Sequence, residues 1–265
     1  MPSKRGSRSL ILSTMIVCAS AGFPPIAAAQ TGCLTSADAI VTDRPGATNS
    51  PLAVPYGSAQ VESGVQWTGR NRSNVVDGTE TILRFGVAEC TEFDVQVPDY
   101  FYAINGPAAS GFSDVTAGFN HQFTLNPGNF IFGAGAGITF PSGANAVSNH
   151  GYNPYVQFMW SRNLPYEWSL SGMFIATWYT SQPAQNPTLQ PSVQISRNIG
   201  RYASAFAEYY GDYNHQRPSQ IVDGGFLYPL TLRQQIDLSA GFGLNSSSPS
   251  QFVGAGYSFR LDDIF

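Results

Sequence analysis

Residues 113–123 read SDVTAGFNHQF, and their side chains alternate between two kinds. The odd-numbered positions from Val115 to Phe123 are mostly apolar, whereas the even-numbered positions from Asp114 to Gln122 are polar or small. Successive side chains of a β-strand point to opposite faces, so this stretch predicts a strand with one apolar face and one polar face. From Val115 to Ser161 the chain has no Asp, Glu, Lys or Arg, but polar residues interrupt every apolar run, which excludes a transmembrane helix there.

The same alternation recurs along the chain and predicts about twelve strands. Long helices are disfavoured because 27 glycines and 18 prolines punctuate the sequence. Short connections alternate with longer, more polar ones, an asymmetry that is typical of outer-membrane β-barrels. We therefore expect an all-β chain folded as a single antiparallel up-and-down transmembrane β-barrel. The expected strands lie near residues 58–68, 79–87, 92–103, 113–123, 129–140, 151–163, 167–180, 188–198, 202–213, 218–228, 233–244 and 251–261.

A soluble two-sheet sandwich would show the same alternation. Its water-facing side would be charged, however, whereas the non-apolar positions here are mostly Gly, Ser, Thr, Gln and Asn. Only 11% of the residues are charged, with 13 Lys and Arg against 17 Asp and Glu. No nucleic-acid partner is expected, because such binding requires clustered cations. A closed barrel is favoured because it satisfies every main-chain group in hydrocarbon.

The N-terminal region has the three parts of a secretory signal peptide. Lys4, Arg5 and Arg8 form a basic region, residues 10–17 are apolar, and residues 27–29 are three alanines. Residues 1–29 are therefore expected to be a signal peptide that directs the chain to the bacterial outer membrane. Residues 30–57 are Pro-rich and lack a strand period, so they either plug the lumen or hang free in the periplasm. Residues 58–265 are expected to form the barrel.

Two cysteines, Cys33 and Cys90, follow the predicted cleavage site. An exported chain enters an oxidising compartment, so these two residues are expected to form a disulfide. The alternative is two unrelated buried thiols, since only the even number and the compartment argue for pairing.

Charged residues within the expected strands fall on the polar face, which would point into the lumen. Acids outnumber arginines among them, so the lumen would favour cations over anions. The alternative is a structural network that braces the barrel interior. Aromatic residues on the same face, Tyr155, Tyr179, Phe206 and Tyr210, would give the lumen apolar patches. The charged lumen residues expected from this parity are Glu62, Glu80, Arg84, Asp94, Asp114, Glu208, Asp223, Asp237 and Arg260.

Several short motifs resemble a known family. Residues 42–64 include TDRPG (42–46), VPYG (54–57) and QVESG (60–64), and later residues include LRFG (83–86) and GFSD (111–114). These motifs are similar to those of the meta-pathway phenol-degradation proteins of the outer membrane. The resemblance implies an outer-membrane barrel that acts as a transporter and is associated with the catabolism of aromatic compounds. The C-terminus resembles the aromatic-ended signal that the barrel-assembly machinery recognises, in Tyr257, Phe259 and Phe265.

The expected function is therefore passive diffusion of small solutes, with aromatic or hydrophobic compounds as candidates. A non-transporting barrel that supports the envelope or binds a partner is the alternative, and a hydrolase site on the rim, pairing His150 with Ser148 or His215 with Asp212, is a weaker one. No catalytic motif and no metal-spaced cluster is found, so no enzyme activity, metal or cofactor is expected. The expected partners are outer-membrane lipid and lipopolysaccharide. Arg70, Arg72 and Arg217 lie in the expected outer loops, where they either contact lipopolysaccharide phosphates or, as the favoured account, are simply solvated loop charges.

Overall fold

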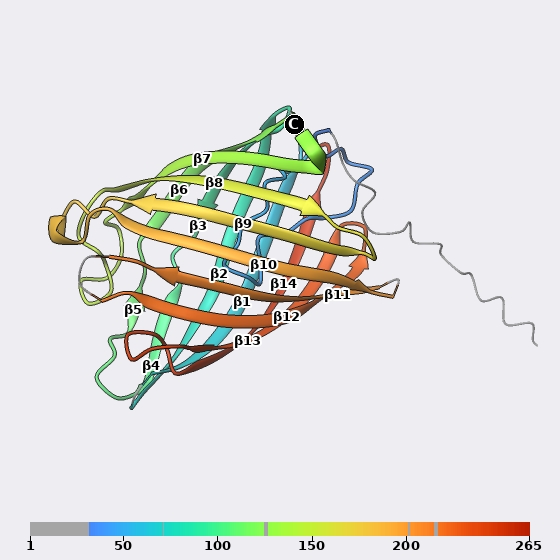
Figure 1. The fold of residues 1–265 in the computed structure, drawn as a ribbon. Coiled ribbons are helices and arrows are strands. Elements are labelled where there is room, and N and C mark those ends of the chain that lie inside the picture. Colours follow the sequence, from blue (N-terminus) through green and yellow to red (C-terminus); the bar gives the residue numbers. More distant parts are fainter. Residues whose placement is uncertain (1–31, 71, 125–126, 201, 215–216) are drawn as a thin grey trace, which may run out of the picture.

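The computed structural model describes residues 32–265 apart from 71, 125–126, 201 and 215–216 (Figure 1). The expected signal peptide, residues 1–29, lies outside the described residues. Two short 3-10 turns, Pro127–Asn129 and Pro183–Gln185, are the helical elements of the described chain. None of its helices has the length and apolar character needed to cross a membrane. The strands are β1 (Ala59–Arg70), β2 (Ser73–Ala88), β3 (Thr91–Gln96), β4 (Tyr100–Asn105), β5 (Gly111–Phe112), β6 (Val115–Phe123), β7 (Phe130–Phe140), β8 (Asn153–Asn163), β9 (Trp168–Thr177), β10 (Thr188–Ile199), β11 (Ala203–Asp212), β12 (Ser219–Thr231), β13 (Gln234–Gly243) and β14 (Gln251–Leu261).

The strands form one antiparallel sheet that closes on itself. β1 pairs with β2 on one side and with β14 on the other, and the β1–β14 register runs from Ala59↔Leu261 to Gly69↔Gln251. Around the rest of the barrel, β3 follows β2, and β6 to β14 follow in chain order. The wall therefore consists of the 12 strands β1, β2, β3 and β6 to β14, and β4 and β5 are two extra strands. The expected all-β up-and-down barrel is confirmed.

One of the expected strands is interrupted. The strand expected at 92–103 is divided into β3 and β4, whereas the one expected at 113–123 corresponds to β6, with the two-residue strand β5 ahead of it. Pro98 lies in the interruption, where its nitrogen cannot donate a ladder hydrogen bond. Main-chain hydrogen bonds from Val97 N to Thr81 O (2.9 Å) and from Ser113 N to Asp99 O (2.8 Å) hold the residues between β3 and β4.

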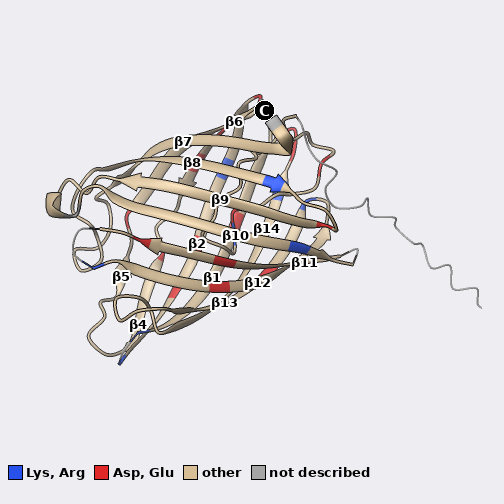
Figure 2. Ribbon diagram, in the orientation of Figure 1, with Lys and Arg blue, Asp and Glu red and all other residues tan. Residues whose placement is uncertain are grey.

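The barrel has its apolar side chains outside and its polar side chains inside. On the outer face Phe119, Leu238 and Phe242 are 55%, 59% and 56% exposed, whereas Glu62 and Arg84 on the inner face are 0% exposed. Figure 2 shows the charged residues of the strands as isolated bands between long uncharged stretches. This arrangement reverses that of a water-soluble protein and suits a wall surrounded by hydrocarbon.

The chain that precedes β1 lies inside the barrel. Thr48 contacts Ser192 of β10, Asn49 contacts Gln157 of β8, and Val54 contacts Glu92 of β3. Because these strands come from different sides of the wall, residues 41–54 cross the lumen; we call them the inner segment (Figure 1, blue).

Two glycines of the wall let the chain before β1 approach closely. A Cβ atom at Gly86 would collide with the Pro55 carbonyl oxygen, and one at Gly64 would collide with the Arg44 guanidinium. A side chain at either position would push this part of the chain away from the wall.

Candidate functional site

The lumen is organised around one buried arginine, Arg84 of β2. Its guanidinium lies 2.9 Å from Glu62 of β1 and 2.9 Å from Glu92 of β3. The same group lies 3.5 Å from Asp43 of the inner segment and donates to the Leu52 carbonyl oxygen at 3.1 Å. Arg84 therefore joins two wall strands to the inner segment. A buried charge needs such a full set of partners, because none of its hydration is left.

Two wall carboxylates also hold the inner segment by its main chain. Glu62 accepts the N–H groups of Asp43 (2.8 Å) and Arg44 (2.9 Å). On the adjoining part of the wall, Glu92 accepts the N–H group of Val54 (2.8 Å). These are hydrogen bonds to charged acceptors, which are stronger than neutral ones.

A third carboxylate, Glu208 of β11, holds the middle of the inner segment. It accepts the main-chain N–H groups of Ala47 and Thr48 at 2.7 Å each, and the Thr48 hydroxyl also donates to it. Asp223 of β12 lies directly opposite Glu208 in the β11–β12 register. Among the described residues, no salt bridge to a cation is formed by either acid of this pair.

Arg44 reaches from the inner segment to the wall. Its guanidinium forms salt bridges with Glu80 of β2 (2.5 Å) and with Asp237 of β13 (3.5 Å). A Cβ atom at Gly256 of β14 would lie 2.7 Å from Arg44 Nε, so this glycine makes room for the arginine. Arg44 thus pairs two of the acids that parity places in the lumen.

Arg260 and Asp262 form a second charged cluster at the end of the barrel where β1 begins and β14 ends. Arg260 donates to Asp262 (2.7 Å) and to the main-chain carbonyl of Asp38 (2.8 Å). Ser58 donates to Asp262 at 2.9 Å, and Arg233 also donates to this carboxylate. Burial alone would raise the pKa of Asp262, but the hydrogen bonds from Arg260, Arg233 and Ser58 outweigh it, and the pKa is lowered.

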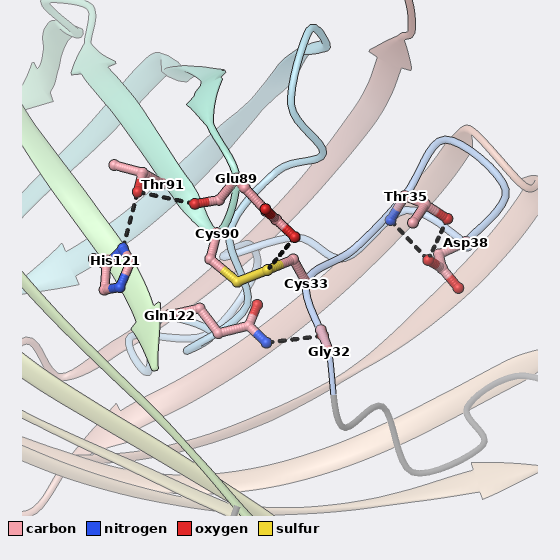
Figure 3. The surroundings of a disulfide bond; sticks show 9 residues. All are labelled: Gly32, Cys33, Thr35, Asp38, Glu89, Cys90, Thr91, His121 and Gln122. Carbon is pink, nitrogen blue, oxygen red and sulfur yellow. Dashed lines mark hydrogen bonds between the residues drawn. A yellow bond between two sulfur atoms is a disulfide. The ribbon is translucent and has the colours of Figure 1, made fainter. Parts of the chain in front are cut away.

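A disulfide between Cys33 and Cys90 anchors the chain ahead of the inner segment (Figure 3). Cys90 lies in the turn between β2 and β3. Next to Cys33, the Gly32 carbonyl oxygen accepts a hydrogen bond from the Gln122 side chain (3.0 Å). The other end of the inner segment continues into β1 at the same end of the barrel. The inner segment is therefore part of a covalent loop with both ends fixed at one rim.

Cavities remain on both sides of the inner segment. Toward the long loops, one cavity of 440 Å³ and another of 180 Å³ are lined by Asp43 and Asn49 of the inner segment. Toward the short turns, a cavity of 240 Å³ is lined by the same two residues and by Phe206. The inner segment therefore divides the lumen without filling it.

The expected lumen aromatics occupy different places. Tyr155 and Tyr179 line the 180 Å³ cavity, together with Ile175. Phe206 is only 6% exposed and lies on the other side of the inner segment. Tyr210 is half-buried on β11, two residues beyond Glu208. The four residues therefore do not form one continuous aromatic path.

Most of the expected lumen charges are brought together, but one has another role. Asp94 lies beside Asn120, which donates to it at 3.2 Å. Asp114, expected inside a strand, lies instead between β5 and β6, where it accepts main-chain N–H groups of Gly143 (2.9 Å) and Asn149 (2.8 Å). Burial would raise the pKa of Asp114, but these hydrogen bonds outweigh it and lower the pKa. Asp114 therefore holds the loop after β7 in place.

Sequence reasoning missed several lumen residues, among them Glu92, Arg44, Asp43 and Asp99. Glu92 is in phase with Asp94 on the expected inward face, so the alternation itself contained the signal. Arg44 and Asp43 lie in a stretch without periodicity, and nothing local indicated that they enter the barrel.

Of the two rim pairs considered, the structure describes His150 with Ser148, and there the contact is made by the main chain of His150 and not by its ring. The His150 ring contacts the Asn145 carbonyl oxygen at 3.0 Å through Nε2, and the Ser148 hydroxyl accepts the His150 main-chain N–H. His215 lies outside the described residues. No group of His, Cys, Asp and Glu suited to a metal ion is found in the part of the chain that the structure describes.

Comparisons place this barrel among known proteins. The model of a family described as "Putative MetA-pathway of phenol degradation" matches residues 42–261. The COG4313 outer membrane channel from Pseudomonas putida F1 is similar in structure, with a TM-score of 0.60 and 15% identity, covering 79% of this chain and 97% of that one. The KdgM porin in complex with disordered oligogalacturonate (TM-score 0.54, 8% identity, 76% and 98% covered) and the NanC porin (TM-score 0.54, 11% identity, 77% and 100% covered) are also similar. A search of curated proteins found no match. At these identities the structural likeness shows a shared fold.

Proposed function

Because the chain belongs to the family described as "Putative MetA-pathway of phenol degradation", we propose that it is a channel of the bacterial outer membrane that passes small solutes by passive diffusion. The observation that carries this proposal is the divided lumen, with cavities of 440 and 240 Å³ on opposite sides of the inner segment. Both cavities are lined by many polar side chains, so water and small solutes can occupy them on either side of the inner segment.

The outer wall supports a membrane location. Its strands expose apolar side chains, and closure leaves no unpaired strand edge along the 12-stranded ring. In such a location the partners are outer-membrane lipid and lipopolysaccharide, and the barrel-assembly machinery inserts the chain. Tyr257 and Phe259 lie side by side near the C-terminus, with ring centroids 5.9 Å apart. This is the place where the barrel-assembly machinery would recognise an aromatic-ended signal.

The lining indicates which solutes are suited to the channel. The carboxylates of Asp43, Glu80, Asp94 and Asp99 line the two cavities toward the long loops, where Arg44 is the cation. This excess of negative charge disfavours anions. Tyr155, Tyr179 and Ile175 offer flat apolar surface, which suits neutral aromatic or other hydrophobic compounds.

A second candidate function is a non-transporting barrel that supports the envelope or binds a partner. The observation that favours it is the strength with which the inner segment is held, by Arg84, by three wall carboxylates and by the disulfide. If these contacts never open, the lumen stays divided.

Liposome swelling separates the two candidates. Purified protein in liposomes is expected to admit small neutral solutes, and Tyr179→Ala is expected to slow benzyl alcohol more than glycerol. Tyr166→Ala is the matched control, because Tyr166 is 85% exposed at the opposite end of the barrel. If folded protein admits no solute of any kind, the non-transporting barrel is the correct account.

A further inference from the structure

Among the described strand residues, two charged side chains point to the lipid side of the wall, and both are arginines. Arg162 of β8 continues the exposed face on which Phe158 lies, and Arg197 of β10 continues the one on which Ile195 lies. Wall carboxylates such as Glu62 point into the lumen instead. The outer face of this part of the wall is therefore positively charged, although the lumen is negatively charged.

Both arginines lie near the short turns of the barrel (Figure 2). Arg162 is followed by Asn163, the last residue of β8, and Arg197 lies two residues before Ile199, the last residue of β10. In outer-membrane barrels the short turns face the periplasm. In a membrane the two guanidiniums would therefore lie at the level of the phospholipid headgroups of the periplasmic leaflet.

The two arginines belong to one area of the wall, in which β9 lies between β8 and β10. Arg162 lies opposite Leu170 of β9, which lies opposite Ile195 of β10. One row closer to the turns, Arg197 lies opposite Trp168 of β9. Strand spacing and rise place the main chains of the two arginines roughly 12 Å apart. We call these five residues the basic patch.

Each guanidinium of the basic patch lies over an aromatic ring. The Arg162 guanidinium carbon is 4.9 Å from the ring centroid of Phe130 on β7, and the Arg197 carbon is 5.2 Å from that of Trp168. The negative face of an aromatic ring attracts a cation. These contacts hold both positive charges against the wall, at the depth where the rings lie.

The N–H groups of both guanidiniums remain available. Within the described chain, neither Arg162 nor Arg197 forms a side-chain hydrogen bond or a salt bridge. Glu167, in the turn between β8 and β9, is exposed and pairs with neither of them. A guanidinium carries five N–H donors in a planar fork that matches phosphate oxygens. The basic patch therefore calls for an anionic acceptor from outside the chain.

We propose that the basic patch binds the phosphate of an anionic phospholipid, with the acyl chains along Leu170 and Ile195. Guanidinium and phosphate form charge-assisted hydrogen bonds, which are stronger than neutral ones. A zwitterionic headgroup would bring its own cation close to the two arginines, so a headgroup without a cation is preferred. This inference goes beyond the channel function, because it requires the barrel to lie in a membrane but does not require any solute to pass.

Native mass spectrometry of the full processed chain tests the lipid preference. The protein is released from detergent micelles that contain equal amounts of phosphatidylglycerol and phosphatidylcholine with identical acyl chains. The wild type is expected to retain phosphatidylglycerol about tenfold more often than phosphatidylcholine, as two arginines at an anionic surface require. Glycerol 1-phosphate in large excess is expected not to displace the lipid, because it lacks the acyl chains.

Variants of the two arginines show where the lipid binds. Arg162→Gln/Arg197→Gln is expected to retain the two lipids equally. Arg70→Gln/Arg72→Gln removes the same charge at the opposite end of the barrel and is the matched control, which should keep the wild-type ratio. Folding of each variant is checked by its faster gel migration before boiling. If the double variant of the basic patch does not fold, each single variant should lower the ratio about threefold.

Equal retention of the two lipids by the wild type overturns this inference, and so does an unchanged ratio in the folded variants of the basic patch. Displacement by glycerol 1-phosphate would show a site for soluble phosphate compounds and would overturn the lipid assignment. Liposome swelling distinguishes a failure of the channel function. If the wild type prefers phosphatidylglycerol but admits no solute, the channel function is wrong and the lipid site stands. If solutes enter but no lipid is preferred, only the lipid site is wrong.

Discussion

Arg84 of β2 and Glu62 of β1 form a salt bridge of 2.9 Å whose side chains are 1% and 0% exposed. Arg84→Met would leave Glu62, Glu92 and Asp43 as buried acids without their cation. Removing one partner of a buried ion pair costs about 3–5 kcal/mol, so the urea midpoint for loss of the fast-migrating gel band should fall markedly.

The control for this change is Arg162→Met. Arg162 is exposed, and its guanidinium lies 4.9 Å from the Phe130 ring centroid, a contact worth about 0.5–1 kcal/mol. Equal midpoints for Arg84→Met and Arg162→Met would show that the buried network does not stabilise the barrel.

Glu208 sets how firmly the inner segment is held. Glu208→Ala would leave the main-chain N–H groups of Ala47 and Thr48 without their acceptor, at about 1–3 kcal/mol each. We expect a looser inner segment and at least a tenfold rise in the open fraction recorded in planar bilayers. Asp212→Ala, on the same strand, is the control and should leave the open fraction unchanged, because Asp212 contacts Gln190 of β10. Identical open fractions for both variants would show that the inner segment does not control opening of the channel.

The disulfide between Cys33 and Cys90 closes a loop with a sequence separation of 57. Closing a loop of this length stabilises by roughly 4 kcal/mol in the chain-entropy account. Reductant is therefore expected to lower the urea midpoint of the wild type. The double variant Cys33→Ser/Cys90→Ser should have the lower urea midpoint both with and without reductant. Mass measurement after alkylation without reductant should find no modified thiol at either position, and two alkylated thiols would contradict the bond.

Asp262 makes the stability of the barrel depend on pH. Because the pKa of Asp262 is lowered in the folded protein, its contribution to stability is fully present above the ordinary carboxyl pKa of about 4. This contribution disappears as the pH falls through the lowered pKa of Asp262 in the folded protein. The difference in urea midpoint between wild type and Asp262→Asn should therefore be largest at neutral pH and shrink below pH of about 4. Asp263→Asn is the neighbouring control. A difference that grows on acidification would contradict this assignment.

The strand pattern could be predicted because lipid and lumen impose opposite requirements on alternate residues. Phe119 and Asn120 illustrate this, one exposed on the outer face and the other buried inside. The interruption between β3 and β4 was not predicted, although the alternation changes phase there: Phe93 lies on the outer face of β3, whereas Tyr100 and Tyr102 are the exposed residues of β4. Pro98 was the available signal, since proline cannot donate within a central strand.

The inner segment could not be placed from sequence. Its position depends on Glu62, Glu92 and Glu208, which come from three separate strands and meet only when the sheet closes. The wall glycine Gly86 also becomes informative only when Pro55 is known to lie against it. These are contacts between distant residues, which a local period does not contain.

The reversal potential of the protein in a planar bilayer, under a gradient of potassium chloride, tests the central claim most directly. A closed barrel whose cavities are lined by Asp43, Glu80, Asp94 and Asp99 should conduct and should prefer potassium over chloride. A folded, inserted protein that carries no current, or one that prefers chloride, would contradict the account.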